Sequence, residues 1–324
     1  MSDKKSISDK YSEQLVTRVN ELFYDSSNED YNDEISKEMS ETETNRWRNL
    51  ASIFIVSDSP KKLLDIGTGT GFVPIAISDL LSESNEFVCS DLSNGMLNIA
   101  KENISRMKNN CNCKFDFVKI NGDTPLKLPF DNSSFDVIMM NSVLHHIKNI
   151  SNFLEEINRI IKPNGIVIIA HEPNRKFNDN LFLSLIYGLL KIFLLPKLFI
   201  SEVSQLLGFN QLIKKIYYSF NKKKKEIVDS KLISINNKLI SESLIDKPLD
   251  MNEIAMITDV RDSEGFYPIE IFSNFSLIHL ETYQHIHLIS IHYIKSKFIN
   301  LIDKFLKNNF LNDGERFCAV YKKL

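Results

Sequence analysis

Apolar positions along the chain follow two different rhythms. Between residues 10 and 56 they recur at helical spacing, as in Leu15, Val19 and Leu22, which predicts amphipathic helices. From Lys61 the pattern changes to short apolar runs that alternate with helical periods. Short apolar strands alternating with helices are typical of a parallel sheet covered on both faces. The sequence therefore predicts an N-terminal helical segment followed by an α/β core.

The expected elements of this core can be read off by residue range. The predicted strands are 63–66, 87–91, 115–120, 135–140, 166–170, 277–287 and 316–321, and the predicted helices are 72–81, 95–107, 151–161 and 294–307. The rhythm breaks between residues 175 and 262, which predicts an inserted helical subdomain. The expected segments are an N-terminal helical cap at 1–60, a core at 61–174, the insert at 175–262, and a strand–helix–strand unit at 263–324.

Composition and charge exclude several classes of protein. With 324 residues, 43% of them hydrophobic and 25% charged, the chain is not a disordered or collagen-like polymer. The net charge of −3 gives no basic excess, so no nucleic-acid partner is expected. Cys111 and Cys113 do not have a zinc-pair spacing, and we interpret the four cysteines as reduced structural thiols. No secretory signal follows the polar start of the chain, so we expect a cytoplasmic protein.

A glycine-rich turn is the sharpest chemical signal. Asp65-Ile66-Gly67-Thr68-Gly69-Thr70-Gly71 lies between a predicted strand and a predicted helix. Glycines at such a turn allow strained dihedral angles and a close approach of the backbone to a ligand. The spacing is GxGxG, whereas the dinucleotide fingerprint is GxGxxG. The alternative is an ordinary strand-to-helix turn without a ligand.

Two aspartates follow the next two strands. Asp91 can accept both hydroxyl groups of a ribose, and Leu92 and Met96 could pack on a purine face. The alternative role for Asp91 is a helix N-cap, for which Ser93 or Asn94 is the better candidate. Asp123, in Asn121-Gly122-Asp123, can accept a hydrogen bond from an adenine amino group or can be a turn residue.

These motifs together resemble the class I S-adenosylmethionine-dependent methyltransferases, in particular the small-molecule "type 11" group. The resemblance is carried by LLDIGTGTG (63–71), FVCSDLSNGML (87–97), NGDTPLKLPFDNSSFDVIMMNSVLHHI (121–147) and FLEEINRIIKPNGIVIIAHEPN (153–174). It implies a Rossmann-like, mostly parallel seven-stranded sheet with helices on both faces and an antiparallel last strand. The resemblance and the motifs together give a set of expected cofactor-binding residues. They are Asp65, Gly67, Thr68, Gly69, Gly71, Asp91, Leu92, Met96, Gly122, Asp123 and Asn141.

Two departures from the family pattern are visible. Asn164 replaces the usual glycine in the turn after Pro163, and asparagine also tolerates a left-handed conformation. The segment that starts at Asn141 is not the Asn-Pro-Pro-Tyr type that holds an amide or amino nitrogen in the DNA and protein-glutamine enzymes. The resemblance therefore favours a small-molecule acceptor.

Methyl transfer from a sulfonium is a direct displacement that requires alignment and needs no metal. A hydroxyl or ammonium acceptor also needs a base. The four candidates at the ends of the fourth and fifth strands are His145, His146, His171 and Glu172. The alternative for each is a capping or core role. We interpret His285 and His287 as structural, because two ligands do not make a zinc site.

The sequence thus predicts a methyltransferase acting on an apolar or aromatic metabolite, with the acceptor atom (O, C or N) open. A non-catalytic S-adenosylmethionine-binding module and an NAD(P)-dependent oxidoreductase are the alternatives. The apolar run at 181–200 is interpreted as a lid over the site, with a membrane-surface helix or a span as alternatives. The basic run at Lys222–Lys225 is expected to be a solvated loop, and peripheral membrane contact through 181–225 is the minority interpretation.

Overall fold

The computed structural model describes most of the chain and divides it into two compact units. Residues 10–26, 41–57, 59–107, 113–183, 185, 222–283, 304–307 and 313–324 are described. The first unit comprises Met1–Asn174, Ile254–Glu281 and Arg316–Leu324, and the second comprises Arg175–Glu253 and Thr282–Glu315. The sheet, apart from the last two residues of β6 (Phe275–Tyr283), and every residue of the site described below belong to the first unit.

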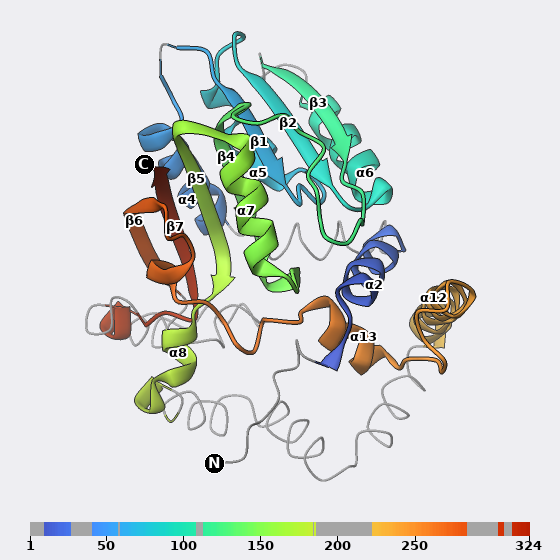
Figure 1. Cartoon of the computed structure of the whole chain (residues 1–324). Coiled ribbons are helices and arrows are strands. Elements are labelled where there is room, and N and C mark those ends of the chain that lie inside the picture. The colour runs from blue at the N-terminus through green and yellow to red at the C-terminus, as the bar shows by residue number, and fades with distance from the viewer. Residues whose placement is uncertain are drawn as a thin grey trace. The chain divides into compact units, whose positions relative to one another are not determined.

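The first unit is built on a seven-stranded sheet of the predicted kind, with strand order β3-β2-β1-β4-β5-β7-β6 (Figure 1). The strands are β1 (Lys62–Ile66), β2 (Glu86–Asp91), β3 (Lys114–Lys119), β4 (Phe135–Asn141), β5 (Ile161–Pro173), β6 (Phe275–Tyr283) and β7 (Arg316–Lys323). The pairs β1–β2, β1–β4, β2–β3 and β4–β5 are parallel, and β7 runs antiparallel to β5. The strand order reverses beside β1, so the carboxyl ends of β1 and β4 form the crevice where such sheets bind ligands.

Helices cover both faces of this sheet. Those of the first unit are α2 (Glu13–Asp25), α4 (Glu41–Phe54), α5 (Phe72–Ile77), α6 (Asn94–Arg106) and α7 (Ile150–Ile160), with single turns η1 (Ser78–Leu80), η2 (Leu144–His146) and η3 (Pro268–Glu270). Neighbouring strand residues such as Leu63 and Leu64 are both fully buried although their side chains point to opposite faces. Leu64 belongs to the core cluster that includes Phe153 and Ile157 of α7, which crosses one face of the sheet (Figure 1). Leu63 lies outside that cluster and packs on the other face.

Most predicted elements of the core are confirmed within a few residues, and the differences have physical reasons. β5 begins at Ile161 rather than at Ile166 because the Pro163-Asn164-Gly165 turn lies within it, as an irregularity in its pairing with β4. Asn164 has a φ of 60°, the left-handed conformation that its side chain tolerates. The predicted helix at 294–307 is described only for residues 304–307, and the end of the predicted strand at 277–287 lies outside the described residues.

The second unit corrects one prediction. The Lys222–Lys225 run is not a loop: it opens α12 (Lys222–Ser241), in keeping with the good helix propensity of lysine. The unit also contains α8 (Arg175–Asp179), and α13 (Met251–Thr258) begins in it. In the proposed lid segment, the side chains of Leu181, Phe182 and Leu185 are exposed, and residues 186–200 lie outside the described part of the chain. No described helix combines the length and the hydropathy that a membrane span requires.

The N-terminal helix α2 is tied to the start of α6. Ser93 is the N-cap of α6, as predicted, and its hydroxyl oxygen accepts a hydrogen bond from the Met96 amide at 3.0 Å. The same hydroxyl donates to the Asp25 carboxylate of α2 at 2.6 Å, and the Gly95 amide donates to that carboxylate at 3.1 Å. A carboxylate at a helix N-terminus is also favoured by the helix dipole. This junction holds α2 beside the end of β2.

Replacing Ser93 by alanine removes both the helix cap and a charge-assisted hydrogen bond. We expect Ser93→Ala to lower the free energy of unfolding by about 2 kcal/mol. Urea denaturation of both proteins measures this difference. Ser105→Ala is the matched control, because Ser105 lies exposed near the end of the same helix and should change stability by less than about 0.5 kcal/mol. Equal effects of the two substitutions would contradict the assigned role of Ser93.

Candidate active site

The glycine-rich turn after β1 depends on backbone conformations that favour glycine. Gly67, Gly69 and Gly71 have φ values of 68°, 52° and 91°. A Cβ atom on Gly67 would come within 2.7 Å of Val143, and one on Gly71 would touch Ala100 of α6 at 3.4 Å. A Cβ on Gly69 would have no protein atom within 4 Å, so this glycine faces open space. The first and third glycines therefore serve packing, and the middle one leaves room for a ligand.

Asp65, at the end of β1, has a buried carboxyl group that lacks hydrogen-bond partners. It is 1% exposed, and within the described part of the chain neither of its oxygens accepts a hydrogen bond of normal geometry. Burial raises the pKa of Asp65 from 3.8 to about 8; the Thr68 hydroxyl opposes the rise and the Asp91 carboxylate adds to it. A buried acid of this kind is stabilised when a cationic or hydrogen-bond-donating group is placed next to it.

Asp91, at the end of β2, is held by the backbone around it. One carboxylate oxygen accepts from the Gly69 amide at 2.8 Å, and the other accepts from the Ser93 amide at 2.9 Å. Burial raises the pKa of Asp91, the backbone amides oppose the rise, and the nearby Asp25 carboxylate adds to it. Each carboxylate oxygen has two lone pairs, so Asp91 can accept further hydrogen bonds from a bound ligand.

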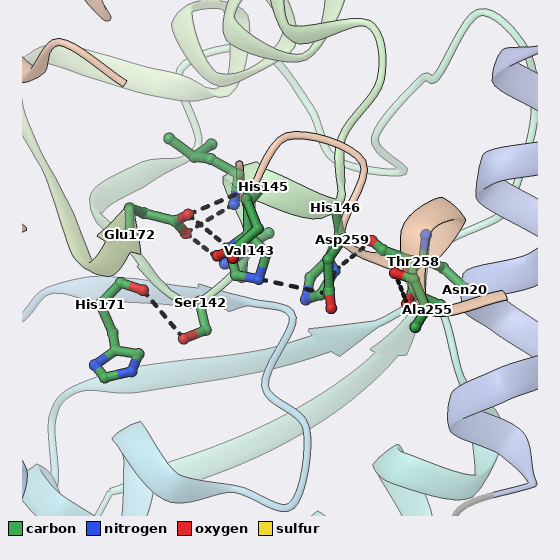
Figure 2. A network of polar contacts seen from close by, with 12 residues as sticks. Asn20, Ser142, Val143, His145, His146, His171, Glu172, Ala255, Thr258 and Asp259 are labelled. Carbon is green, nitrogen blue, oxygen red and sulfur yellow. Dashed lines mark hydrogen bonds and ion pairs between the residues drawn. The ribbon is translucent and has the colours of Figure 1, made fainter. Parts of the chain in front are cut away.

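Glu172 organises the turn that follows β4 (Figure 2). Its side chain is fully buried and accepts hydrogen bonds from the backbone amides of Val143 at 2.5 Å, Leu144 at 2.8 Å and His145 at 3.2 Å. It also accepts from Nδ1 of His145 at 2.8 Å, which leaves Nε2 of that ring as the available nitrogen. Because both of its carboxylate oxygens accept hydrogen bonds from residues 143–145, Glu172 positions the turn after β4.

His146 is the centre of a second polar network, which joins three segments of the chain. Its Nδ1 lies 2.7 Å from the Thr258 carbonyl oxygen and 3.3 Å from Oδ1 of Asp259 (Figure 2), and its Nε2 lies 3.3 Å from the Tyr24 hydroxyl of α2. Burial disfavours the imidazolium, but the hydrogen bond and charge of Asp259 outweigh burial and raise the pKa of His146 above its ordinary 6.5. His146 thus has the carboxylate partner of a general base.

Strained backbone marks the adjacent ends of β4 and β5. Ser142 and His171 have φ values of 58° and 60°, and the Ser142 hydroxyl donates to the His171 carbonyl at 3.3 Å (Figure 2). The pairing of β5 with β7 is irregular at His171. Burial, together with the charges of Arg316, His145 and Arg46, lowers the pKa of His171 to about 3. His171 is therefore neutral at physiological pH.

These groups surround one cavity of about 400 Å³. The predicted site residues that line it are Asp65, Gly67, Thr68, Gly69, Asp91, Leu92, Met96, Asn141, His145, His146 and His171. Gly71, Gly122, Asp123 and Glu172 are not among the lining residues, and Asp123 is exposed.

The cavity also has walls that the sequence motifs did not indicate. Helix α2 contributes Glu13, Thr17, Asn20 and Tyr24, helix α4 contributes Glu43, the α7 start contributes Lys148 and Asn149, and the end of α13 contributes Asp259. These residues belong to no recognisable motif. For the residues of α2 and α4, the available sequence signal was the helical periodicity of residues 10–56. That periodicity predicts the helices, but it does not predict which side of each helix faces a ligand.

Comparison with known proteins identifies the core of the chain. Residues 64–169 match the family model described as "Methyltransferase domain". The chain is similar to a demethylmenaquinone methyltransferase of Staphylococcus aureus, with 33% identity over 107 residues. That match covers 33% of this chain and 41% of the relative, so the chain spans about two fifths of the length of the curated relatives that it matches.

The solved structures to which the chain is similar include two that are described as S-adenosylmethionine-dependent methyltransferases. One, described as putative, is from Methanococcus maripaludis (21% identity, 60% of this chain and 84% of that chain, TM-score 0.39). Another is from Aquifex aeolicus (22% identity, 41% of this chain and 72% of that chain, TM-score 0.31). Similarities of this size do not identify a substrate.

The buried Asp65 should make the ligand-free protein less stable as the pH rises. Its pKa is 3.8 in the unfolded chain and about 8 in the fold, so the unfolded state ionises first and stability is lost between these values. We expect Asp65→Asn to remove this loss and to raise the melting temperature more at pH 8 than at pH 5. Asp116→Asn, at a half-exposed position on β3, is the control. A gain that is independent of pH would contradict the shifted pKa of Asp65.

Proposed function

We propose that the protein is a class I, S-adenosylmethionine-dependent methyltransferase that transfers a methyl group to a small molecule with an apolar or aromatic body, because residues 64–169 match a methyltransferase domain. One observation carries this proposal. The glycine-rich turn and the carboxyl groups of Asp65 and Asp91 meet the His145–His146 turn in a single cavity. A cofactor-binding surface and a candidate base therefore share one enclosed space.

The residues at the ends of β1 and β2 fit S-adenosylmethionine. Asp65 would receive the ammonium group of the methionine end, because it is a buried acid that no described residue satisfies. Asp91 would receive the ribose hydroxyl groups on its spare lone pairs. Leu92 and Met96 would pack on the adenine. When bound, S-adenosylmethionine supplies a methyl group on a positively charged sulfur, which an acceptor atom can displace directly.

Proton removal from the acceptor is assigned to His146. Its Nδ1–H donates to the Thr258 carbonyl, so its Nε2 carries the lone pair of the neutral ring and faces the Tyr24 hydroxyl. The proton of the acceptor passes to Nε2 directly or through Tyr24, and Asp259 stabilises the imidazolium that forms. The low pKa makes His171 too weak a base for this role. Glu172 acts by positioning His145 and the turn.

The acceptor side of the cavity includes apolar walls. Ile147 and Phe153 line it beside the His145–His146 turn. The match to a protein named for demethylmenaquinone supports a small-molecule acceptor, because that protein acts on the compound in its name. Orientation of the acceptor in such an enclosed site can contribute several kcal/mol to the lowering of the barrier.

The proposed function is tested in two steps. Calorimetry with S-adenosylmethionine and with NADH as the competing ligand shows which cofactor binds. The protein is then incubated with S-adenosylmethionine and a cell extract, and mass spectrometry identifies the metabolite that gains a methyl group. Binding without any methylated product would favour a non-catalytic module, and binding of NADH alone would overturn the proposal.

Asp91 should contribute strongly to cofactor affinity. The lost hydrogen bonds to a charged group predict that Asp91→Ala weakens S-adenosylmethionine binding by about tenfold or more. Asp123→Ala, at an exposed position outside the lining of the cavity, should change the dissociation constant by less than about threefold. Calorimetry on both variants measures the difference. If Asp91→Ala leaves the affinity for S-adenosylmethionine unchanged, Asp91 does not bind the cofactor.

The raised pKa of His146 gives the reaction a characteristic pH dependence. Turnover requires the neutral ring, so the rate should fall as the pH drops below the pKa of His146, which lies above 6.5. Asp259→Asn removes the charge that raises this pKa, and the acid limb of the pH–rate profile should move to lower pH. Tyr24→Phe should reduce the rate and leave that limb in place. A limb that does not move in Asp259→Asn would contradict the assignment of His146.

A further inference from the structure

Three side chains with metal-binding atoms converge where β6 lies beside β7 at the edge of the sheet (Figure 1). His279 and Glu281 are two residues apart on β6, so they share one face of the strand, and Cys318 lies on β7. One imidazole nitrogen, one carboxylate oxygen and the Cys318 sulfur all lie within 4.8 Å of one another. None of the three residues lines the cavity described above.

The sheet and helix α4 fix the positions of these donors. Cys318 is fully buried in the register of β7 opposite Ala170, and its thiol is free. The ring of His279 packs against Phe54 of α4, with 5.8 Å between the ring centroids. Within the described part of the chain its two nitrogens have no hydrogen bond, so one of them is available as a ligand. Strand pairing therefore fixes Cys318, and packing on α4 fixes His279, before any ion binds.

The charges around the cluster favour a cation. Nε of Arg46 in α4 lies 3.5 Å from Oε2 of Glu281, and Nη1 of Arg46 pairs with Oε1 of Glu43. Two carboxylates therefore share one guanidinium. The other oxygen of Glu43 is buried, accepts no hydrogen bond from a described residue, and lies 4.0 Å from Nδ1 of His171. Arg46 can keep its pair with Glu43 while Glu281 turns toward an ion, so ion binding does not leave the arginine unpaired.

We propose that His279, Glu281 and Cys318 bind a divalent cation of borderline softness, with Zn²⁺ as the type case and water as the fourth ligand. One nitrogen, one oxygen and one sulfur ligand in a tetrahedron is a set that Zn²⁺ accepts, whereas Mg²⁺ and Ca²⁺ require oxygen ligands. Tetrahedral zinc separates its ligand atoms by about 3.5 Å, so side-chain shifts of about 1 Å complete the site. On binding, the S–H bond of Cys318 breaks, a sulfur–metal bond forms, and the proton leaves to the solvent.

Such an ion would join the two strands at the edge of the sheet, beside α4. Burial, with the charge of Glu281, raises the pKa of the Cys318 thiol to about 12, so the thiol remains protonated until a metal replaces the proton. The ion would fix β6 to β7 and leave Arg46 paired with Glu43. Because Glu43 lines the cavity, the metal would stabilise one wall of the proposed active site from outside it.

Cobalt(II) is the probe that distinguishes this site from the other cluster of possible metal ligands among the described residues. A thiolate ligand gives Co²⁺ a charge-transfer absorption, and tetrahedral coordination gives intense visible bands. We expect both features on titration of the full-length protein with one equivalent of Co²⁺, and we expect Zn²⁺, but not Mg²⁺, to displace them. The other cluster of donors, His145, His146 and Asp259, contains no sulfur and cannot produce the thiolate band.

Substitutions of the proposed ligand residues test whether these side chains bind the Co²⁺ ion. Cys318→Ser is nearly isosteric and should abolish the charge-transfer band, and His279→Gln should weaken Co²⁺ binding by at least about tenfold. Cys113→Ser is the matched control and should retain the band, because this partly exposed cysteine precedes β3, at the opposite edge of the sheet from β6. Circular dichroism confirms that each variant folds, and if Cys318→Ser does not fold, His279→Gln decides.

The outcomes are separable. Loss of the band in Cys318→Ser together with weaker binding in His279→Gln supports the site, as does a higher melting temperature of the wild type with Zn²⁺. A wild type without the thiolate band, or a band that survives in Cys318→Ser, overturns it. Retention of full Co²⁺ affinity in His279→Gln also overturns it. None of these results depends on methyl transfer, so they leave the proposed function untouched.

Discussion

A single buried carboxylate holds the site side of the sheet together. Glu172 accepts three backbone amides and one imidazole nitrogen from the turn after β4, although it belongs to the neighbouring strand β5. Removing it would leave several buried donors without a partner, which is far more costly than losing one hydrogen bond. The places of His145 and His146 in the cavity, and the strained backbone at Ser142 and His171, all depend on this bridge.

The elements that repeat a local pattern could be predicted from the sequence. An apolar run predicts strand β1, and a carboxylate after an apolar strand predicts the place of Asp91. The repeated glycines predict the turn, and their positive φ angles in the structure agree with that prediction. Roles that depend on tertiary contacts could not. Glu172 is adjacent to His171 in the sequence and belonged to the same set of candidate bases, but its burial and its four donors give it a positioning role. Asp259 is more than one hundred residues from its partner His146.

The cavity is also distinctive in its charge. Among its described lining residues, five carry carboxyl groups, namely Glu13, Glu43, Asp65, Asp91 and Asp259. Lys148 is the one lysine or arginine among those residues, and its ammonium group donates to the Tyr11 carbonyl. Where these carboxyl groups are ionised, they attract a cationic cofactor and repel anionic acceptors. The same charges disfavour an anionic dinucleotide, which agrees with the departure of the glycine spacing from the dinucleotide fingerprint.

The walls of the cavity come from different parts of the chain. The segment that resembles other proteins, residues 64–169, supplies the cofactor side, while α2, α4 and Asp259 close the space from outside that segment. A shortened protein limited to residues 64–169 would retain the glycine turn and lose Tyr24, Glu43 and Asp259. Exchange of the flanking helices could therefore redirect such a protein to a new acceptor without disturbing the cofactor. The architecture thus places the cofactor side of the cavity on the segment that matches other methyltransferases, and much of the remaining wall on segments outside that match.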